Sequence, residues 1–279
     1  MILYVKAGED GTSVGDCPFS HYVRMVLEEK SLSYELRPTT HDTKPNWLLE
    51  YYDGQLPALR HQKECYIESD VIVAFLNYFF PAAAVGSDDP DQLHPEEAPD
   101  PVVSQTNLDT VEGSVLDDSF FPTMARYLKD VNDTAETEDA VIEKLGLLEN
   151  HFKQLCRTTC TNSVCPSWCY LDGTQTNFDT KLDCRLLPQL YHLSVGIAAF
   201  KSSNTNKSED TKDDADDDDD TDNDVPTNDN NNNNPINLKQ DYPYVYKYMM
   251  AGMERPSFVT TKYSSETIVW GWTNARKYQ

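Results

Sequence analysis

The sequence predicts an α/β domain of about 80 residues followed by an all-helical domain. Residues 1–80 alternate short apolar runs with amphipathic stretches, whereas the readable apolar patterns of residues 102–279 have a helical period. Between them, residues 81–101 are rich in proline and acidic side chains and show no apolar period. This composition is typical of a linker between two folded units.

In the first domain, apolar runs predict four strands and amphipathic patterns predict three helices. The strands are expected at 2–5, 33–36, 56–59 and 64–67, and the helices at 18–30, 47–52 and 70–80. The resulting order, β-α-β-α-β-β-α, is that of a thioredoxin-like domain.

In the second domain, the periodicity predicts helices over 108–127, 139–155, 183–201, 244–253 and a short segment near the C-terminus. The helix from 183 is apolar on most sides, which favours a central, buried position. Thr180 is expected to cap it, with Asp183 reaching back to the Thr180 amide.

Two segments interrupt the helical domain. Residues 201–235 consist mainly of Asp, Asn, Ser and Thr, so they cannot bury apolar surface and are predicted to be disordered. Residues 156–178 contain four cysteines in the spacing C-x3-C-x4-C-x3-C. This spacing leaves three interpretations open, namely a zinc site without paired C-x2-C knuckles, a local disulfide, or an inert loop. The four cysteines are Cys156, Cys160, Cys165 and Cys169.

Charge and composition exclude several classes of protein. The formal net charge of −24 argues against a nucleic-acid partner, because phosphate would be repelled. No apolar run approaches the roughly 20 residues of a membrane-spanning helix, and the apolar start is too short for a secretory signal. Seven cysteines, unevenly spread, do not form a secreted disulfide framework. We therefore expect a cytoplasmic protein of a reducing compartment, and a monomer.

The reactive group predicted by the sequence is Cys17. Residues 15–20 read Gly-Asp-Cys-Pro-Phe-Ser and lie between the first strand and the first helix. Pro18 suits the first helical position, which leaves Cys17 at the helix N-terminus, where amides and the macrodipole favour a thiolate. Ser20 stands where dithiol oxidoreductases have a second cysteine, so the second thiol must be borrowed, and glutathione is the obvious donor. The alternative is that Cys17 is a small buried apolar residue.

Three further features fit a glutathione site. Leu56 and Pro57 lead into a strand and resemble the cis-proline turn of thioredoxin-like folds. Glu68 and Ser69 begin the next helix and offer a carboxylate and a helix-terminal amide to an amino-acid end. Lys44 could neutralise a carboxylate.

Several motifs together resemble the plant-type dehydroascorbate reductases of the glutathione transferase superfamily. The similarity extends from residue 1 to about 275, interrupted by the two insertions. It implies the glutathione transferase fold and the reduction of dehydroascorbate to ascorbate with oxidation of two glutathiones; no metal is expected. The matching segments are 15–20, 27–30, 44–50, 68–72, 190–193, 255–258 and 271–272.

The resemblance also implies a role for each site residue. Cys17 would be the catalytic thiol. Substrate would be held by Lys6 and Asp16, and by His192 and Tyr191 if these face the cleft and not the core. Glutathione would be bound by Phe19, Lys44 at the glycyl carboxylate, Leu56 and Pro57 at the cysteinyl backbone, and Glu68 and Ser69 at the γ-glutamyl end. Lys6 would make the Cys17 thiol acidic.

The chain also departs from the family, because His21 and Tyr22 replace the usual Gln-Arg. One alternative is an omega-class transferase, whose thiol chemistry overlaps. Another is a chloride-intracellular-channel-like protein, in which the first helix would enter a membrane. Here that helix carries charges such as Arg24 and Glu28, which are costly in lipid. The last alternative is an inactive binding module that uses its acidic segment.

Overall fold

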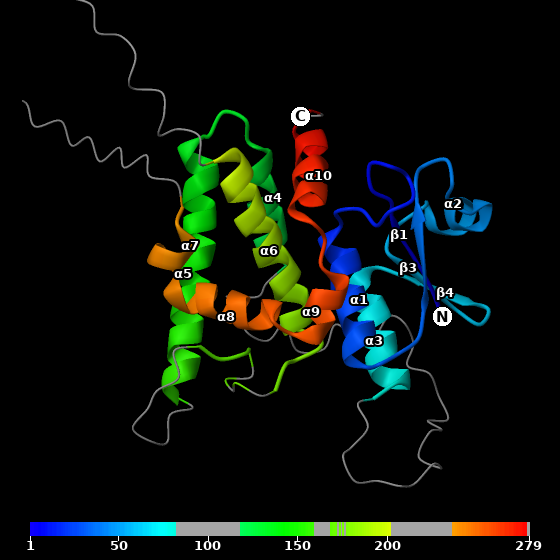
Figure 1. Cartoon of the computed structure of the whole chain (residues 1–279), viewed down its shortest axis with the longest axis horizontal. Helices are drawn as coiled ribbons and strands as arrows, with labels where there is room; N and C mark the ends of the chain where they lie inside the picture. Colours follow the sequence, from blue (N-terminus) through cyan, green and yellow to red (C-terminus); the bar gives the residue numbers. More distant parts are fainter. Residues whose placement is uncertain are drawn as a thin grey trace, which may run out of the picture.

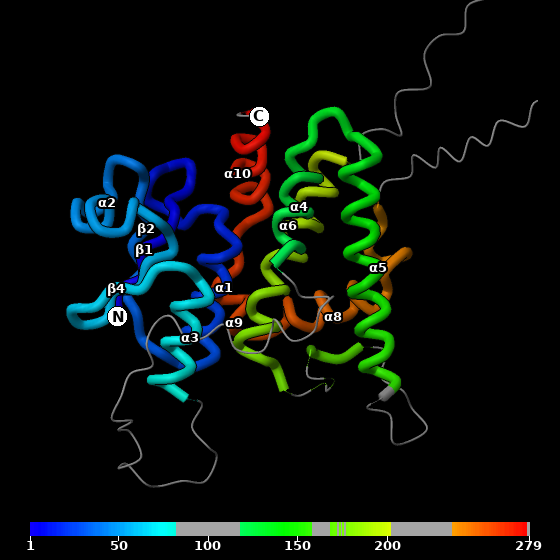
Figure 2. The backbone as a smooth tube through the Cα atoms, turned by 180° about the vertical axis from the view of Figure 1, so that it is seen from behind, coloured from blue at the N-terminus to red at the C-terminus, as the bar shows by residue number. Residues whose placement is uncertain are grey.

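The structure, a computed structural model of the chain, describes residues 1–81, 118–158, 168–171, 173, 175, 177–201 and 236–277. Nearly all of the predicted linker, the start of the helix expected from 108, the middle of the cysteine-rich insertion and nearly all of the acidic insertion lie outside the described residues. The arrangement of the described elements is shown from two sides in Figures 1 and 2.

A four-stranded mixed sheet forms the core of the first domain, in the order β2-β1-β3-β4. β1 runs parallel to β2, while β3 is antiparallel to both β1 and β4. Because of this register, the carboxyl ends of β1, β2 and β4 meet the start of β3 at one edge of the sheet. The strands are β1 (Ile2–Lys6), β2 (Glu35–Thr39), β3 (Ala58–His61) and β4 (Glu64–Ile67).

The two faces of the sheet are covered by different helices: α1 (Pro18–Glu29) and α3 (Ser69–Phe79) on one, α2 (Asn46–Tyr52) on the other (Figure 1). Alternate residues of β1 belong to different cores, as the period of two requires. Leu3 and Val5 join the large cluster that contains α1 and α3. Tyr4 packs with Leu48 of α2 and Ala58 in a small one.

The second domain is helical throughout its described part, and α6 lies at its centre. α6 packs against α1, α4, α8 and α10, so it is buried on most sides, as its apolar pattern predicts. Together the two domains confirm the predicted fold class. The helices are α4 (Phe120–Lys129), α5 (Ala135–Thr158), α6 (Asp183–Phe200), α7 (Leu238–Asp241), α8 (Pro243–Met253), α9 (Pro256–Thr261) and α10 (Ser265–Lys277).

The start of α6 differs from the prediction. Asp179, not Thr180, accepts the amides of Lys181 and Leu182, at 2.8 and 2.6 Å. The Asp183 carboxylate reaches back to the amide of Asp179 at 2.7 Å. The reciprocal capping exists, therefore, but it begins one residue earlier, and Thr180 donates instead to Asn77 of α3.

Hydrogen bonds from α9 and from the residues next to it hold α1 in place. Arg24 of α1 donates to the carbonyl of Thr261 at 2.8 Å. At the end of α1, Glu29 accepts two hydrogen bonds from Arg255, at 2.9 and 2.7 Å, and one from Ser257. The bidentate pair is only partly exposed, so these bonds contribute more than a surface ion pair would.

Candidate active site

The edge of the sheet where three strands end and β3 begins gathers most of the predicted site residues. Lys6 is the last residue of β1, and Pro57 directly precedes β3. Glu68 directly follows β4. It lies near Pro57, because Ile67 of β4 is paired with Ala58 of β3. Lys44 lies in the connection that follows β2. Residues distant in sequence are therefore brought to one end of the domain by strand register alone.

Gly15 joins the end of β1 to the start of α1. Its amide donates to the carbonyl of Lys6 at 2.7 Å. A Cβ at this position would lie 2.6 Å from the carbonyl oxygen of Ala7, so the close approach requires glycine. This contact places the next two residues, Asp16 and Cys17, directly over the end of β1.

Cys17 is the N-cap of α1, and Pro18 is its first helical residue, as predicted. The Cys17 carbonyl accepts the amide of His21 at 3.1 Å and the hydroxyl of Tyr263 at 3.0 Å. Tyr263 lies between α9 and α10, so the C-terminal part of the chain holds the backbone of Cys17 in place. No sequence pattern indicates this residue.

The surroundings of Cys17 do not favour the acidic thiol that the sequence predicts. Solvent reaches part of Cys17, but its thiol is surrounded by protein atoms, and this burial raises the pKa of the Cys17 thiol above its ordinary value. The negative charge of Asp16 raises it further, whereas Ser20 and the amide of Phe19 lower it. Lys6, expected to acidify the thiol, is instead paired with Asp16, with 2.7 Å between Nζ and Oδ1.

α10 forms a wall beside Asp16 and Lys6. A Cβ built on Gly271 of this helix would overlap the Asp16 carboxylate. The neighbouring Trp270 presents its ring to the Lys6 ammonium, which lies 5.5 Å from the ring centre. The resemblance marked Gly271 only as part of a matching dipeptide, because a single glycine within a helix carries no signal of what it touches.

Two of the segments predicted to bind glutathione have unusual backbone geometry. The Leu56–Pro57 peptide bond is cis, as its resemblance to the thioredoxin-like turn implies. Glu68 has φ +63°, in the left-handed region that side chains seldom occupy and that is common at functional sites. The next residue, Ser69, is buried at the first position of α3. Lys44 is half-buried and extends along Gly54.

His192 and Tyr191 lie in the core of the protein and not in an open cleft. His192 is 0% exposed, and within the described residues neither of its ring nitrogens has a hydrogen-bond partner. Burial lowers the pKa of His192 to about 3, with a smaller contribution from the positive charge of Lys6. Tyr191 donates its hydroxyl to the carbonyl of Tyr263 at 3.0 Å. The expectation that these two side chains reach substrate is therefore not supported.

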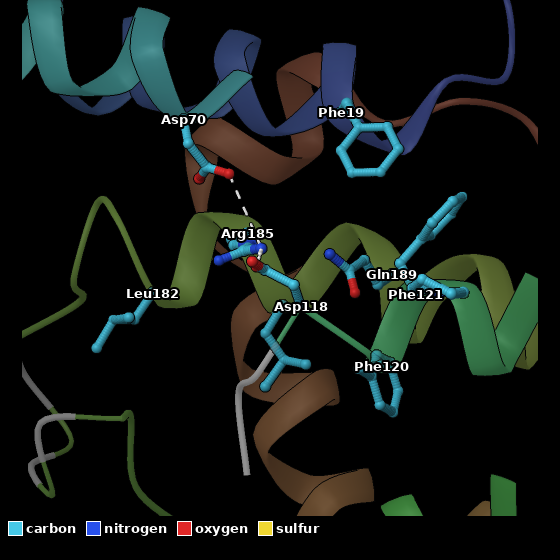
Figure 3. A pocket seen from close by; sticks show the side chains of 10 residues that line it. Phe19, Asp70, Asp118, Phe120, Phe121, Leu182, Arg185 and Gln189 are labelled. Atoms are coloured by element: carbon cyan, nitrogen blue, oxygen red, sulfur yellow. Dashed lines mark hydrogen bonds and ion pairs between the residues drawn. The ribbon is translucent and has the colours of Figure 1, made fainter. Parts of the chain in front are cut away.

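A cavity of about 250 Å³ lies beside the site, between the two domains (Figure 3). The rings of Phe19 and Phe121 meet edge to face at one side, with centroids 4.6 Å apart. At the other side, the Arg185 guanidinium lies between Asp118 and Asp70, the latter 3.8 Å away. Two of its lining residues are close in sequence to predicted site residues: Phe19 is two residues after Cys17, and Asp70 directly follows Ser69. Of its residues only Phe19 was predicted, because the others come from helices whose packing the sequence does not reveal.

A second, more open hollow of about 540 Å³ lies over Glu9 and the outer face of α10, and it includes Trp270. Among the residues that the structure describes, no group of three or more His, Cys, Asp and Glu side chains is arranged to hold a metal ion. The helices described are also each too short or too polar to cross a membrane.

Comparison with known proteins places this geometry in a family context. Residues 16–77 match the family described as the glutathione S-transferase N-terminal domain. The chain is 26% identical over 260 residues to glutathione S-transferase DHAR2 of Arabidopsis thaliana, covering 93% of this chain and 90% of that protein. It is 23% identical over 262 residues to a probable cytosolic glutathione S-transferase DHAR1 of rice, with the same two coverages.

Solved structures show the same fold. A dehydroascorbate reductase of Chlamydomonas reinhardtii superposes with a TM-score of 0.63 and 21% identity, covering 98% of this chain and 97% of that one. A Tau-class glutathione S-transferase from mango superposes with a TM-score of 0.61 and 16% identity, covering 99% and 97%. The fold is therefore that of the glutathione transferases, as the sequence motifs imply.

Proposed function

We propose that the chain is a member of the glutathione transferase superfamily related to the dehydroascorbate reductases, and that it reduces dehydroascorbate to ascorbate at the expense of two glutathiones, with Cys17 as the reacting thiol. The relatives that cover nearly the whole chain are named as DHAR glutathione S-transferases or as a dehydroascorbate reductase, which supports an oxidoreductase that uses glutathione. The observation that carries the assignment of Cys17 is its position. It is the N-cap of α1 directly before Pro18, and it stands where strand register also brings the cis Pro57 and Ser69.

The proposed reaction has three steps. The Cys17 thiolate attacks an electrophilic carbonyl of dehydroascorbate; with uptake of water, ascorbate leaves and Cys17 remains as a sulfenic acid. One glutathione then condenses with the sulfenic acid to give a mixed disulfide and releases water. A second glutathione attacks the mixed disulfide, which yields glutathione disulfide and restores the Cys17 thiol. In sum, dehydroascorbate gains the two electrons and two protons that two glutathiones lose.

The residues around Cys17 divide into two groups in this proposal. Lys6 and Asp16 form an ion pair over the end of β1 that can present both a cation and a carboxylate to the hydroxyl and carbonyl groups of the substrate. On the other side, Ser69 and Glu68 begin α3, where the backbone amides and an adjacent carboxylate suit a zwitterionic γ-glutamyl end.

Formation of the thiolate is opposed by burial and by Asp16, and assisted by Ser20 and the first amides of α1. A substrate that engages Asp16 would therefore also ease the ionisation of Cys17, because a neutralised carboxylate no longer raises the pKa of the thiol. This links binding of the electrophile to activation of the nucleophile without a separate general base.

The omega-class reading is not favoured, because the curated relatives that cover most of the chain are named as DHAR enzymes. The channel-like reading required α1 to leave the protein. In the structure α1 packs on α3, α6 and α9 and holds the buried Arg24 by a hydrogen bond to the carbonyl of Thr261. Removing α1 would break that bond and expose its apolar face.

The test is a turnover assay with glutathione and dehydroascorbate, followed at the ascorbate absorbance. Cys17→Ser should lower turnover by at least about 10³-fold, because an alcohol cannot form the sulfenic acid or mixed disulfide. Cys65→Ser is the matched control. Cys65 is also half-buried and lies in β4, an outer strand of the same sheet, but burial raises the pKa of its thiol to about 11. The Cys65→Ser variant should retain nearly full activity. Equal losses in both variants, or substantial turnover by Cys17→Ser, would show that the thiol is wrongly assigned.

A further inference from the structure

Two buried cysteines of the helical domain, Cys156 and Cys169, lie next to each other. Cys156 lies in the last turn of α5, and Cys169 lies in the segment 168–171, which contacts the end of that helix. Both residues are 0% exposed, and their sulfur atoms are 3.0 Å apart. Two sulfurs this close inside a packed core are within reach of a covalent bond.

Packing on both sides holds the pair in this position. The Cys169 sulfur also lies 4.0 Å from the carbonyl of Phe152, one turn earlier in α5. The neighbouring Tyr170 is packed against Phe178, with ring centroids 5.0 Å apart. The next amide, that of Leu171, donates to the buried Asp183 carboxylate at 3.1 Å. Because these contacts fix the segment directly after Cys169, they keep the Cys169 sulfur next to that of Cys156.

The separation of the two sulfurs lies between the values for a disulfide and for two ligands of one zinc ion. Two thiolates on one tetrahedral zinc, each about 2.3 Å from the metal, would lie about 3.8 Å apart. A disulfide bond requires about 2.05 Å. The 3.0 Å separation exceeds the length of a bond by about 1 Å, which small side-chain rotations can close, and among the described residues no third ligand is arranged with the pair to hold a metal.

We propose that Cys156 and Cys169 are a modification site, at which a hydroperoxide converts the two thiols into a reversible disulfide. One thiol attacks the peroxide oxygen and becomes a sulfenic acid, with loss of water when the oxidant is hydrogen peroxide. The second thiol attacks the sulfenic sulfur, forms the disulfide and releases a second water. The two thiols lose two electrons, and the peroxide is reduced to two waters. Two glutathiones reverse the reaction and leave as glutathione disulfide.

The close partner thiol has a chemical consequence. A sulfenic acid with no thiol nearby is open to further, irreversible oxidation, whereas a thiol at 3.0 Å traps it as a disulfide. Both sulfurs are buried, so a small oxidant such as a hydroperoxide reaches them in the packed protein, whereas reduction by glutathione requires local opening of the segment 168–171. The site is independent of Cys17 and of the reaction proposed for it.

The experiment is peptide mapping of the whole protein after exposure to hydrogen peroxide, alkylation of the remaining thiols and proteolysis. A linked peptide joining Cys156 to Cys169 is expected, 2 Da lighter than the two thiol peptides together and absent after treatment with glutathione. In the Cys160→Ser/Cys165→Ser variant, the same link should form to the same extent. Its oxidised form should melt about 5 °C or more above its reduced form, because a cross-link restricts the unfolded chain even when the loop that it closes is short.

Three results would overturn the proposal. One is oxidation of Cys17 without any link between Cys156 and Cys169. Another is preferential linkage of either residue to Cys160 or Cys165 in the unaltered chain. The third is one zinc per purified chain that is lost in the Cys156→Ser variant, which would restore the metal reading. Cys184→Ser, a change at another buried cysteine, serves as the control for general loss of packing and should leave the link intact.

Discussion

The Asp16 carboxylate occupies the space that a side chain on Gly271 would fill. Asp16 belongs to the loop that presents Cys17, and Gly271 to the interior of α10, so the absence of one methyl group in the last helix makes room for a charged group at the active site. The same carboxylate pairs with Lys6 and raises the pKa of the Cys17 thiol. The position of a single glycine therefore bears on the Lys6–Asp16 ion pair and on the Cys17 thiol together.

Gly271→Ala should displace Asp16 and separate it from Lys6. We expect kcat/KM for dehydroascorbate to fall by about tenfold or more, which corresponds to about 1.4 kcal/mol of lost interaction. Gly146→Ala is the control, because a Cβ at Gly146 in α5 meets nothing within 4 Å. There, alanine should stabilise the protein by roughly 0.5–1 kcal/mol and leave kcat/KM unchanged. Unaltered kinetics in Gly271→Ala would mean that Asp16 is not held as the structure shows.

Asp16→Asn should make the Cys17 thiol more acidic, because it removes a negative charge that raises the pKa of that thiol. The measurement is the pH dependence of alkylation by iodoacetamide, read from the mass of the Cys17 peptide. Its midpoint should move to lower pH, while that of Cys65 in the same sample stays in place. A midpoint that moves upward would contradict the electrostatic role given to Asp16.

The variant Glu68→Gly should show whether Glu68 matters for its backbone conformation or for binding glutathione with its carboxylate. Glycine accepts the φ of +63° without strain, so stability should change by less than about 1 kcal/mol, while loss of the carboxylate should raise KM for glutathione about tenfold. Gln62→Gly is the matched control, since Gln62 has φ +56° in the turn between β3 and β4. It should have the same small effect on stability and none on KM. An equal rise of KM in both variants would exclude the role of Glu68.

Stability should depend on pH through Asp183. Burial raises the pKa of this carboxyl from 3.8 to about 7, although the amides of Asp179 and Leu171 act in the opposite direction. The folded protein therefore retains a proton that the unfolded chain has lost above about pH 4, so this contribution to the free energy of unfolding decreases as pH rises from about 4 to about 7.

Asp183→Asn removes that titration. The free energy of unfolding of the unaltered protein, relative to that of this variant, should fall by roughly 2–4 kcal/mol between pH 4.5 and pH 7.5 in urea titrations. Asp42→Asn, at a carboxylate that is 94% exposed, should show no such trend. Parallel pH curves for the unaltered protein and Asp183→Asn would show that the folded protein holds this carboxyl ionised.

The parts of the fold that local pattern controls were predictable. β4 has the predicted bounds, and the position of Cys17 followed from Pro18, which marks a helix start whatever surrounds it. β2 was expected at 33–36 but spans Glu35–Thr39. Pro38 weakened its signal, although a proline is tolerated here because β2 is the edge strand of the sheet.

The contacts that tune the site were not predictable, because they join residues more than two hundred positions apart. The hydroxyl of Tyr263 bonds to Cys17, and the guanidinium of Arg24 bonds to Thr261. Lys6 was expected beside the thiol, but the pairing of its charge with Asp16 depends on the placement of that carboxylate by α10. One sequence cannot indicate which of several nearby charges a lysine will meet.

The fastening of α1 by Arg255, Thr261 and Tyr263 has a consequence for how the protein is made. These partners follow their counterparts on α1 by 226, 237 and 246 residues, so a ribosome synthesises them long after the sheet. An N-terminal domain can begin to fold during translation, but its first helix would then lack its anchors at the beginning, middle and end. In a nascent chain the backbone of Cys17 thus lacks the hydrogen bond that fixes it until the segment around Tyr263 has emerged and docked.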